Sequence, residues 1–271
     1  MMENARRKFL KVAGISALGL SLGTKSVLNV FASADESADR RGKKTAAEIT
    51  ENKKALKAKH WGMVIDTRRL RTVGDLKPLI DVCHKIHNVP KFENSLHEIK
   101  WIWEDEYKHV FPTMESEYLA DSIKHIPFLL LCNQCQNPPC VRACPTKATF
   151  QREDGIVMMD FHRCIGCRFC MAACPYGSRS FNFVDPRTGL DESGIFNEFP
   201  TRMKGVVEKC NFCAERLDVG KMPACVEASN GAIAFGDLED PESDVRKLLK
   251  ENFTIRRKQE LGTEPSVYYI V

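Results

Sequence analysis

Apolar residues in this chain form short blocks, apart from one longer block near the amino terminus that runs from Val12 to Leu22. The block at 128–131 is Phe-Leu-Leu-Leu and predicts a short buried strand or helix. Two short segments, Thr149 to Gln151 and Ile156 to Met159, flank Asp154-Gly155, which predicts a β-hairpin with an Asp-Gly turn. The pattern therefore predicts a globular protein built from short elements.

Two more elements are expected near the carboxyl end. Residues 231–235, Gly-Ala-Ile-Ala-Phe, are expected to form a strand. Ser243 can cap a helix that continues to Asn252, with Val245 on its inward face. We expect this helix to be a structural brace.

The amino-terminal segment has the composition of an export signal. Arg6 and Arg7 are followed by Phe-Leu-Lys, by the apolar block and then by Ala32-Ser33-Ala34, small residues that a signal peptidase prefers. The apolar block is shorter than the roughly 20 residues that a membrane-spanning helix needs. We therefore expect a twin-arginine signal peptide at 1–34, a polar arm at 35–60, a periplasmic or other extracytoplasmic location, and no transmembrane helix in the mature chain.

Composition and charge exclude one large class of function. The chain has 271 residues, of which 43% are hydrophobic and 28% charged, as in globular proteins. The net charge is +4, and residues 1–34 account for it, so the rest of the chain is formally neutral. A nucleic-acid-binding protein would carry a basic face in its folded part, so nucleic acid is not an expected partner. The sequence also shows no phosphate-binding loop or acid–base pair, which predicts a non-catalytic protein.

The twelve cysteines are the strongest chemical signal. The run from Cys164 to Pro175 has the spacing C-x2-C-x2-C-x3-C-P, with which bacterial ferredoxins hold [4Fe–4S] clusters. Three closely spaced thiolates can surround one cubane, and Gly166 permits the tight turn between them. The fourth cysteine lies about one helical turn further along, so it reaches the neighbouring cluster.

A second run, from Cys132 to Pro145, repeats this arrangement with Pro138 and Pro139 as two extra residues. In a pair of such runs, each fourth cysteine crosses to the other cluster. The sequence therefore predicts two clusters, the first on Cys132, Cys135, Cys140 and Cys174, and the second on Cys164, Cys167, Cys170 and Cys144.

The four remaining cysteines form a looser pattern. Alone, Cys210-x2-Cys213-x11-Cys225 fits a zinc half-site or unrelated thiols as well as a cluster. Ser229, however, lies where a fourth cysteine would complete a ferredoxin run, and counting back from Cys83 identifies three more positions without cysteine. We therefore predict a third cluster on Cys83, Cys210, Cys213 and Cys225. We also predict that a fourth cluster has been lost, with its ligand positions now occupied by Val73, Leu76, Leu79 and Ser229.

A binding module stabilised by disulfides or zinc is the alternative from a different class. Export would permit disulfides, but cysteines two residues apart bridge each other poorly. Structural zinc sites use paired C-x2-C elements without a fourth thiol that crosses between sites. No C-x2-C element is followed by histidine, so covalently attached haem is not expected on this chain.

Several segments resemble the iron–sulfur subunits of the molybdopterin oxidoreductase and NrfC-type family. They are Met63-Val-Ile-Asp66, the run from Cys132 to Cys140, Cys164-Ile-Gly-Cys167, Lys209-Cys-Asn-Phe-Cys213 and Leu261–Ile270. Together with the missing cluster and the export signal, the insert at His97–Trp103 most resembles the DsrO-type subunits of the DsrMKJOP membrane complex of sulfate reducers. The resemblance covers nearly everything after residue 60.

The resemblance implies an α+β fold with two ferredoxin-like units. One, at 132–184, would hold two clusters, and the other would be assembled from 61–131 and 205–240, followed by a C-terminal helix and tail at 241–271. It also implies a quinone-interacting, NrfD-type integral membrane partner. In four-cluster relatives the missing cluster faces a molybdenum subunit, so its loss favours a cytochrome c partner and electron relay in respiratory sulfur metabolism. The alternative is the electron-transfer subunit of a soluble extracytoplasmic molybdopterin oxidoreductase.

Aromatic and histidine residues outside the cysteine runs have two interpretations each. Trp101 and Trp103 are two residues apart, which suits either a partner-docking pair or one face of a strand packed against the core. The scattered histidines, including His84 and His87, are expected to be surface groups or hydrogen-bonded structural groups rather than proton acceptors.

Overall fold

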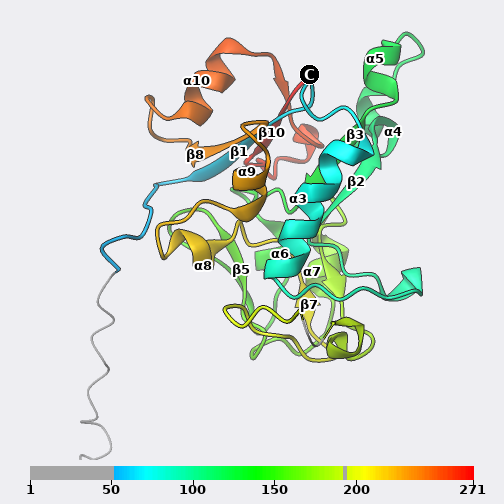
Figure 1. Cartoon of the computed structure of the whole chain (residues 1–271), viewed down its shortest axis with the longest axis vertical. Helices are drawn as coiled ribbons and strands as arrows, with labels where there is room; N and C mark the ends of the chain where they lie inside the picture. The colour runs from blue at the N-terminus through cyan, green and yellow to red at the C-terminus, as the bar shows by residue number, and fades with distance from the viewer. Residues whose placement is uncertain (1–51, 192–193) are drawn as a thin grey trace, which may run out of the picture. The chain divides into compact units, whose positions relative to one another are not determined.

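The computed structural model describes residues 52–191 and 194–271. The signal expected at 1–34, including Arg6 and Arg7, and most of the polar arm expected at 35–60 lie outside the described residues. From residue 52 onward the described chain forms one compact unit of short helices and four small sheets (Figure 1). The predicted α+β fold is confirmed.

The largest sheet contains both the first and the last strand of the described chain, in the order β8-β1-β10-β9. β1 (Trp61–Asp66) pairs parallel with β10 (Val267–Ile270) and antiparallel with β8 (Ile233–Asp237). β9 (Thr254–Ile255) pairs antiparallel with β10. The segment at 241–271 thus contributes two of the four strands and is an integral part of this sheet.

Side chains of β1 alternate between the two faces of the sheet, as the strand geometry requires. Met63 and Ile65 pack into the main hydrophobic core, whereas Val64 packs against Val245 of α10 (Asp244–Glu251). The Ser243 hydroxyl accepts a hydrogen bond from the Arg246 backbone N–H in the first turn of α10, and Asn252 is the C-cap residue. The helix predicted after Ser243 is therefore confirmed, and it covers the outer face of the sheet (Figure 1).

Three antiparallel hairpins complete the strand structure. β2 (Ile102–Glu106) pairs with β3 (Pro127–Leu131), β4 (Thr149–Gln151) with β5 (Val157–Met159), and β6 (Ser180–Phe181) with β7 (Val207–Glu208). The β4–β5 pair is the hairpin predicted around the Asp-Gly turn. Its glycine has a φ of +85°, a left-handed conformation that glycine adopts without steric cost.

The described helices are short, and most of the cysteines lie in helices or next to them. The helices that carry cysteines are α3 (Val73–Ile86), α6 (Pro139–Arg142), α7 (Phe169–Ala173) and α9 (Ala224–Ala228), with α8 (Ala214–Leu217) following Cys213 directly. The β2–β3 connection contains α4 (Tyr107–Val110) and α5 (Asp121–Lys124). Single 3₁₀ turns occur at Ser95–His97, Pro112–Met114, Pro186–Gly189 and Gln259–Leu261.

One hydrophobic core runs through both ferredoxin-like regions expected from the sequence. It includes Met63 and Leu79 from the first region, and Cys132 and Ile156 from the second. The Tyr269 hydroxyl in β10 donates a hydrogen bond to the Leu129 carbonyl oxygen in β3 at 3.0 Å, which joins the large sheet to the β2–β3 hairpin. The two regions therefore pack as one body.

A buried polar network attaches Trp101 to the β6–β7 hairpin. Arg202 and Glu208 form an ion pair at 2.7 Å, and both side chains are fully buried. The Trp101 indole donates to the same carboxylate at 2.8 Å, and the tryptophan is only 1% exposed. The partner-docking interpretation of Trp101 is therefore wrong, because its ring is a core group.

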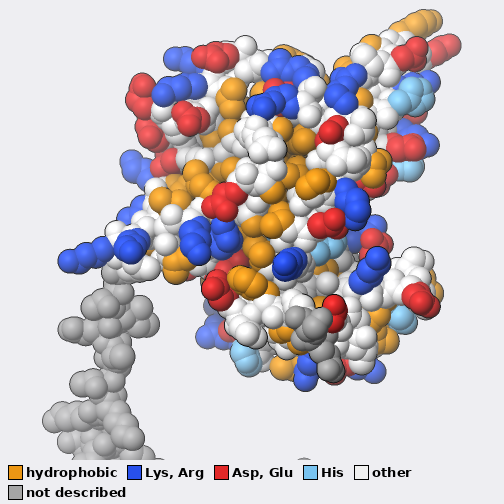
Figure 2. Space-filling model, in the orientation of Figure 1, with side chains coloured by type: hydrophobic (Ala, Val, Ile, Leu, Met, Phe, Trp, Pro, Cys, Tyr) orange, Lys and Arg blue, Asp and Glu red, His pale blue; other side chains and the backbone are white. Residues whose placement is uncertain are grey.

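The surface carries charges of both signs. On the face drawn in Figure 2, Lys and Arg side chains are interspersed with Asp and Glu. In the ranges 52–191 and 194–271, no helix has both the length and the apolar character needed to cross a membrane.

We predict that Arg202→Met lowers the free energy of unfolding by about 3–5 kcal/mol, because it leaves the Glu208 carboxylate buried without its cation. Anaerobic urea unfolding of the cluster-loaded protein measures this change. Lys77→Met is the matched control, since the Lys77–Asp81 pair is exposed and is worth about 0.3–0.5 kcal/mol. An equal effect of the two substitutions would contradict the prediction.

Candidate metal centres

The loop that carries Cys164 and Cys167 is shaped by local backbone contacts. The Asp160 carboxylate accepts hydrogen bonds from the backbone N–H groups of His162 and Arg163, which turns the chain before the first cysteine. Gly166 has a φ of +69°, and a Cβ there would lie 2.5 Å from the Gly205 carbonyl oxygen. Glycine is therefore required at this position both for conformation and for space.

The first predicted ligand set is brought together around one pocket. Cys132, Cys135, Cys140 and Cys174 all line it, together with Tyr176 and Arg179. Burial raises the pKa of the Cys135 thiol to about 12, and the neighbouring thiols of its set add to the increase. These four sulfur atoms therefore lie in one electrostatic environment, as ligands of a single cubane must.

The second predicted set lies next to the first. Burial raises the pKa of the Cys170 thiol, and Cys164 and Cys144 contribute to the increase. Burial also acts to raise the pKa of Cys144, but the Thr149 backbone N–H, 3.4 Å from its sulfur, and other local donors hold it below its usual value. Cys167 lies in the same loop, between Cys164 and Cys170, and is half-buried.

The third predicted set joins segments that are far apart in the sequence. Cys83 comes from α3, whereas Cys210 and Cys213 precede α8 and Cys225 lies in α9. Burial raises the pKa of Cys83 well above its usual range, and the thiols of Cys213, Cys210 and Cys225 raise it further. The structure thus places Cys83 beside the three cysteines with which the sequence grouped it.

The three sets follow one another in space. Burial is the main cause of the raised pKa of Cys170 in the second set, and Arg179 acts to lower that pKa. Cys140 of the first set lies close enough to raise it further. Cys132 of the first set acts in the same way on Cys210 of the third, adding to the larger effect of burial. The order is therefore second, first, third, and the first set is the connecting member.

Two buried cations lie among these sulfur atoms. Burial acts to lower the pKa of Arg179, but the negative charges expected on Cys140 and Cys170 raise it above the usual value. Its buried Nη2 atom has no hydrogen-bond partner among the described residues, which suits a group that faces cluster sulfur. The Lys209 ammonium is also buried and donates to the Cys210 carbonyl oxygen at 2.8 Å and to the carbonyl oxygen of Val157.

Neither buried cation follows from cysteine spacing. Four of the basic residues that lie near the cysteines in the sequence have exposed side chains, namely Arg142, Lys147, Arg163 and Arg168. Arg163 pairs instead with Asp160 at 3.2 Å. Lys209 directly precedes Cys210, and this adjacency is the one feature of the sequence that could have identified the lysine as a compensating charge.

The positions assigned to the lost cluster are occupied by ordinary packing. Leu76 and Leu79 lie in α3 and are almost fully buried in the hydrophobic core, whereas Val73 at the start of the helix is exposed. The Ser229 hydroxyl donates to the Val226 carbonyl oxygen at 2.7 Å and accepts from the Ile233 N–H at 3.1 Å. Its donor hydrogen and an acceptor site are thus engaged by the backbone.

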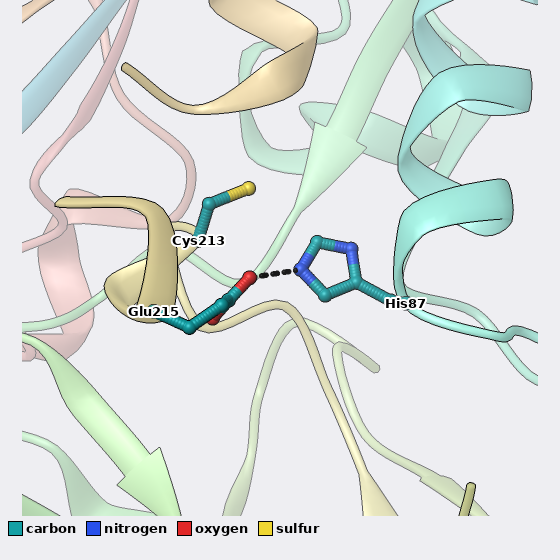
Figure 3. Close-up of side chains that lie close together, drawn as sticks. All are labelled: His87, Cys213 and Glu215. Carbon is teal, nitrogen blue, oxygen red and sulfur yellow. Dashed lines mark hydrogen bonds and ion pairs between the residues drawn. The ribbon is translucent and has the colours of Figure 1, made fainter. Parts of the chain in front are cut away.

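One group of residues beside the third set was missed by sequence reasoning. His87, Cys213 and Glu215 have ligand atoms that all lie within 4.8 Å of one another (Figure 3). The His87 Nε2 atom lies 2.9 Å from the Glu215 carboxylate. Burial acts to raise the pKa of Glu215, but the hydrogen bond and charge of His87 hold it below its usual value. No spacing signal connects residues 128 positions apart.

All twelve cysteines are free thiols, so the structure contains none of the bridges that the disulfide alternative requires. Three sets of four thiols match the ligand requirement of [4Fe–4S] clusters, and the unpartnered Arg179 nitrogen supplies a compensating donor. Bound clusters would supply one-electron transfer, while the protein holds them close together and shields them from solvent.

Comparison with known proteins gives the same class of cofactor. Residues 124–186 match the 4Fe-4S dicluster domain family. The chain is 40% identical to the Hdr-like menaquinol oxidoreductase iron-sulfur subunit 1 of Archaeoglobus fulgidus, over 98% of this chain and 97% of that protein.

Two further relatives extend over most of the chain. The menaquinone reductase iron-sulfur cluster-binding subunit of Nitratidesulfovibrio vulgaris is 36% identical over 78% of this chain and 88% of its own length. An NrfC homolog of Haemophilus influenzae is also 36% identical, over 82% of this chain and 84% of its own length.

We predict that Ser229→Ala leaves the iron content of the anaerobically purified protein unchanged, because the Ser229 hydroxyl is engaged by backbone groups. Ser229→Cys is also expected to bind no additional iron, since Leu76 and Leu79 provide no thiolate. Iron analysis per polypeptide measures both. Loss of about four irons in the alanine variant would show instead that the serine ligates a cluster.

Proposed function

The chain belongs to the family of iron–sulfur subunits that serve menaquinol oxidoreductases and NrfC-type systems, and on that premise we propose that it is an extracytoplasmic relay of three [4Fe–4S] clusters. As an electron-transfer subunit it accepts electrons from one partner and passes them to another. The observation that carries the number three is the division of twelve cysteines into three neighbouring groups, with no cysteine left over.

The order of the sets supports a linear path. The second and first sets are neighbours, because Cys140 raises the pKa of Cys170, and the first and third sets are neighbours, because Cys132 raises the pKa of Cys210. Each bound cluster would change its charge by one electron without making or breaking a substrate bond. The protein's own contribution is burial, which insulates the path, and fixed donors and charges, which set each potential.

The two ends of this path differ in exposure. Cys164 and Cys167 of the second set are half-buried, and their loop carries Ile165 and Phe169, which are 67% and 59% exposed. All four cysteines of the third set are buried. A partner can therefore approach the second cluster closely, and exposed apolar side chains there suit a protein–protein contact.

We assign the membrane side of the relay to a quinone-interacting, NrfD-type integral membrane subunit. The names of two relatives, a menaquinol oxidoreductase subunit and a menaquinone reductase subunit, support menaquinol as the quinone involved. The other partner in this proposal is a cytochrome c subunit, and the setting is respiratory sulfur metabolism. Export by the twin-arginine route, through Arg6 and Arg7, would deliver the folded, cluster-loaded protein to the outer side of the membrane.

We predict that Cys83→Ala removes the third cluster alone and leaves about eight irons per polypeptide, because the other two sets keep all their ligands. Cys167→Ser should damage the second cluster in the same selective way. Iron analysis combined with electron paramagnetic resonance of the reduced protein distinguishes these losses. Retention of every signal after either substitution would contradict the ligand assignment.

We predict that Phe169→Glu slows electron exchange with the partner at the second cluster at least tenfold while iron content stays unchanged. The measurement uses the complex solubilised from membranes. It follows the rate at which a menaquinol analogue reduces the clusters and the rate at which the complex reoxidises them. Phe253→Glu is the control, since Phe253 is 75% exposed and lies outside the cysteine loops.

Unchanged rates of cluster reduction and reoxidation in Phe169→Glu would show that the surface around Phe169 is not a partner contact. Purification with a soluble molybdenum enzyme, and with no membrane or cytochrome subunit, would favour the alternative function instead.

A further inference from the structure

The buried imidazole of His87 lies against a cysteine of the third set. His87 follows Cys83 by four residues at the end of α3, so the two side chains lie on the same face of the helix. The Nδ1 atom of His87 is 2.9 Å from the Cys83 carbonyl oxygen and 3.5 Å from the Cys83 sulfur. The side chain is 1% exposed, so water does not compete for these contacts.

The neighbours of Nδ1 determine which atom donates. A carbonyl oxygen can only accept a hydrogen bond, so Nδ1 must carry a hydrogen. That hydrogen is shared between the Cys83 carbonyl oxygen and the Cys83 sulfur. A sulfur that ligates a cluster is an acceptor, so with a cluster on Cys83 the contact at 3.5 Å would be a hydrogen bond donated by Nδ1.

The imidazole is held in this orientation from three sides. Its Nε2 atom is 2.9 Å from Glu215, whose other oxygen accepts a hydrogen bond from the Asn211 side chain at 2.8 Å. One ring face stacks on Trp101 with ring centroids 4.3 Å apart, and Phe199 meets the ring edge-on at 4.8 Å. Arg202 also donates to the His87 carbonyl oxygen at 2.5 Å, so the buried network fixes the backbone as well.

We infer that His87 is a positioning residue that donates a hydrogen bond to the Cys83 sulfur and thereby raises the reduction potential of the third cluster. The inference rests on the proposed function, because it requires a cluster on Cys83. Reduction adds negative charge that is partly carried by the ligand sulfurs, and a hydrogen bond to sulfur stabilises that charge. The effect is strong where water is excluded.

A mononuclear metal ion on His87, Cys213 and Glu215 is the competing explanation for the same geometry. It would withdraw Cys213 from the third set and leave that cluster with three thiolates. It would also break the hydrogen bond between His87 and Glu215 that holds the ring. The two explanations predict different metal contents, so one preparation distinguishes them.

The test is a redox titration of the full-length, cluster-loaded protein, followed by electron paramagnetic resonance. The signal of the third cluster is assigned as the one lost in Cys83→Ala. His87→Phe preserves the aromatic stack but removes the donor, and we expect at least a tenfold smaller equilibrium constant for reduction of that cluster alone. This change corresponds to a shift of about 59 mV to more negative potential.

Two further variants separate tuning from simple packing. An asparagine amide nitrogen occupies nearly the position of Nδ1, so His87→Asn should restore much of the native potential. His84→Phe is the matched control, because His84 lies on the same helix but its Nε2 atom contacts the Ile102 carbonyl oxygen at 3.1 Å. That control should leave all three potentials unchanged.

An unshifted third potential in iron-replete His87→Phe overturns the inference and leaves the proposed function intact. Loss of the third cluster from both His87 variants also overturns it, because His87 would then be needed for assembly. One zinc per polypeptide with only eight irons supports the mononuclear site instead. An unmutated protein without iron overturns the proposed function and this inference together.

Discussion

The gathering of twelve thiol groups into three adjoining sets, with eight of the thiols buried, is the constraint on which the rest of the structure depends. A thiolate inside a protein is costly unless donors or cations accompany it, and burial raises the pKa of Cys83, Cys135 and Cys210 accordingly. In this fold the cost of buried thiolates is offset by two buried cations, Arg179 and Lys209, and by backbone donors such as the Thr149 N–H. Cluster iron would hold the thiolates in their charged form, so cofactor binding and folding are coupled.

The same constraint applies to the positions at which the sequence predicts a lost fourth cluster. Removing a cubane from the interior leaves a volume that must be filled, because protein interiors tolerate few voids. Here α3 supplies buried Leu76 and Leu79, and a backbone-bonded serine stands where a ligand would be needed. α3 also carries Cys83 at its opposite end, so one helix serves both apolar packing and cluster ligation.

Cysteine spacing groups thiols that are two or three residues apart, because such residues share one loop whatever surrounds it. Cys83 was grouped with the third set because it is the fourth of the four cysteines that remain outside the two ferredoxin-type runs. Contacts between segments that are far apart in the sequence have no spacing pattern from which they could be predicted. The parallel pairing of β10 with β1, the ion pair of Arg202 with Glu208 and the contact of His87 with Glu215 depend on tertiary packing. Trp101 shows the limit of pattern reasoning, since its two-residue spacing from Trp103 suited a docking surface and a core strand equally well.

The number of clusters is the central claim, and iron and acid-labile sulfide per polypeptide test it most directly. The measurement uses full-length protein purified without oxygen, so that cluster decay does not lower the count. Three complete ligand sets predict about twelve of each element. About sixteen would show that a non-cysteine ligand supports a fourth cluster, and a colourless protein without iron would contradict the electron relay altogether.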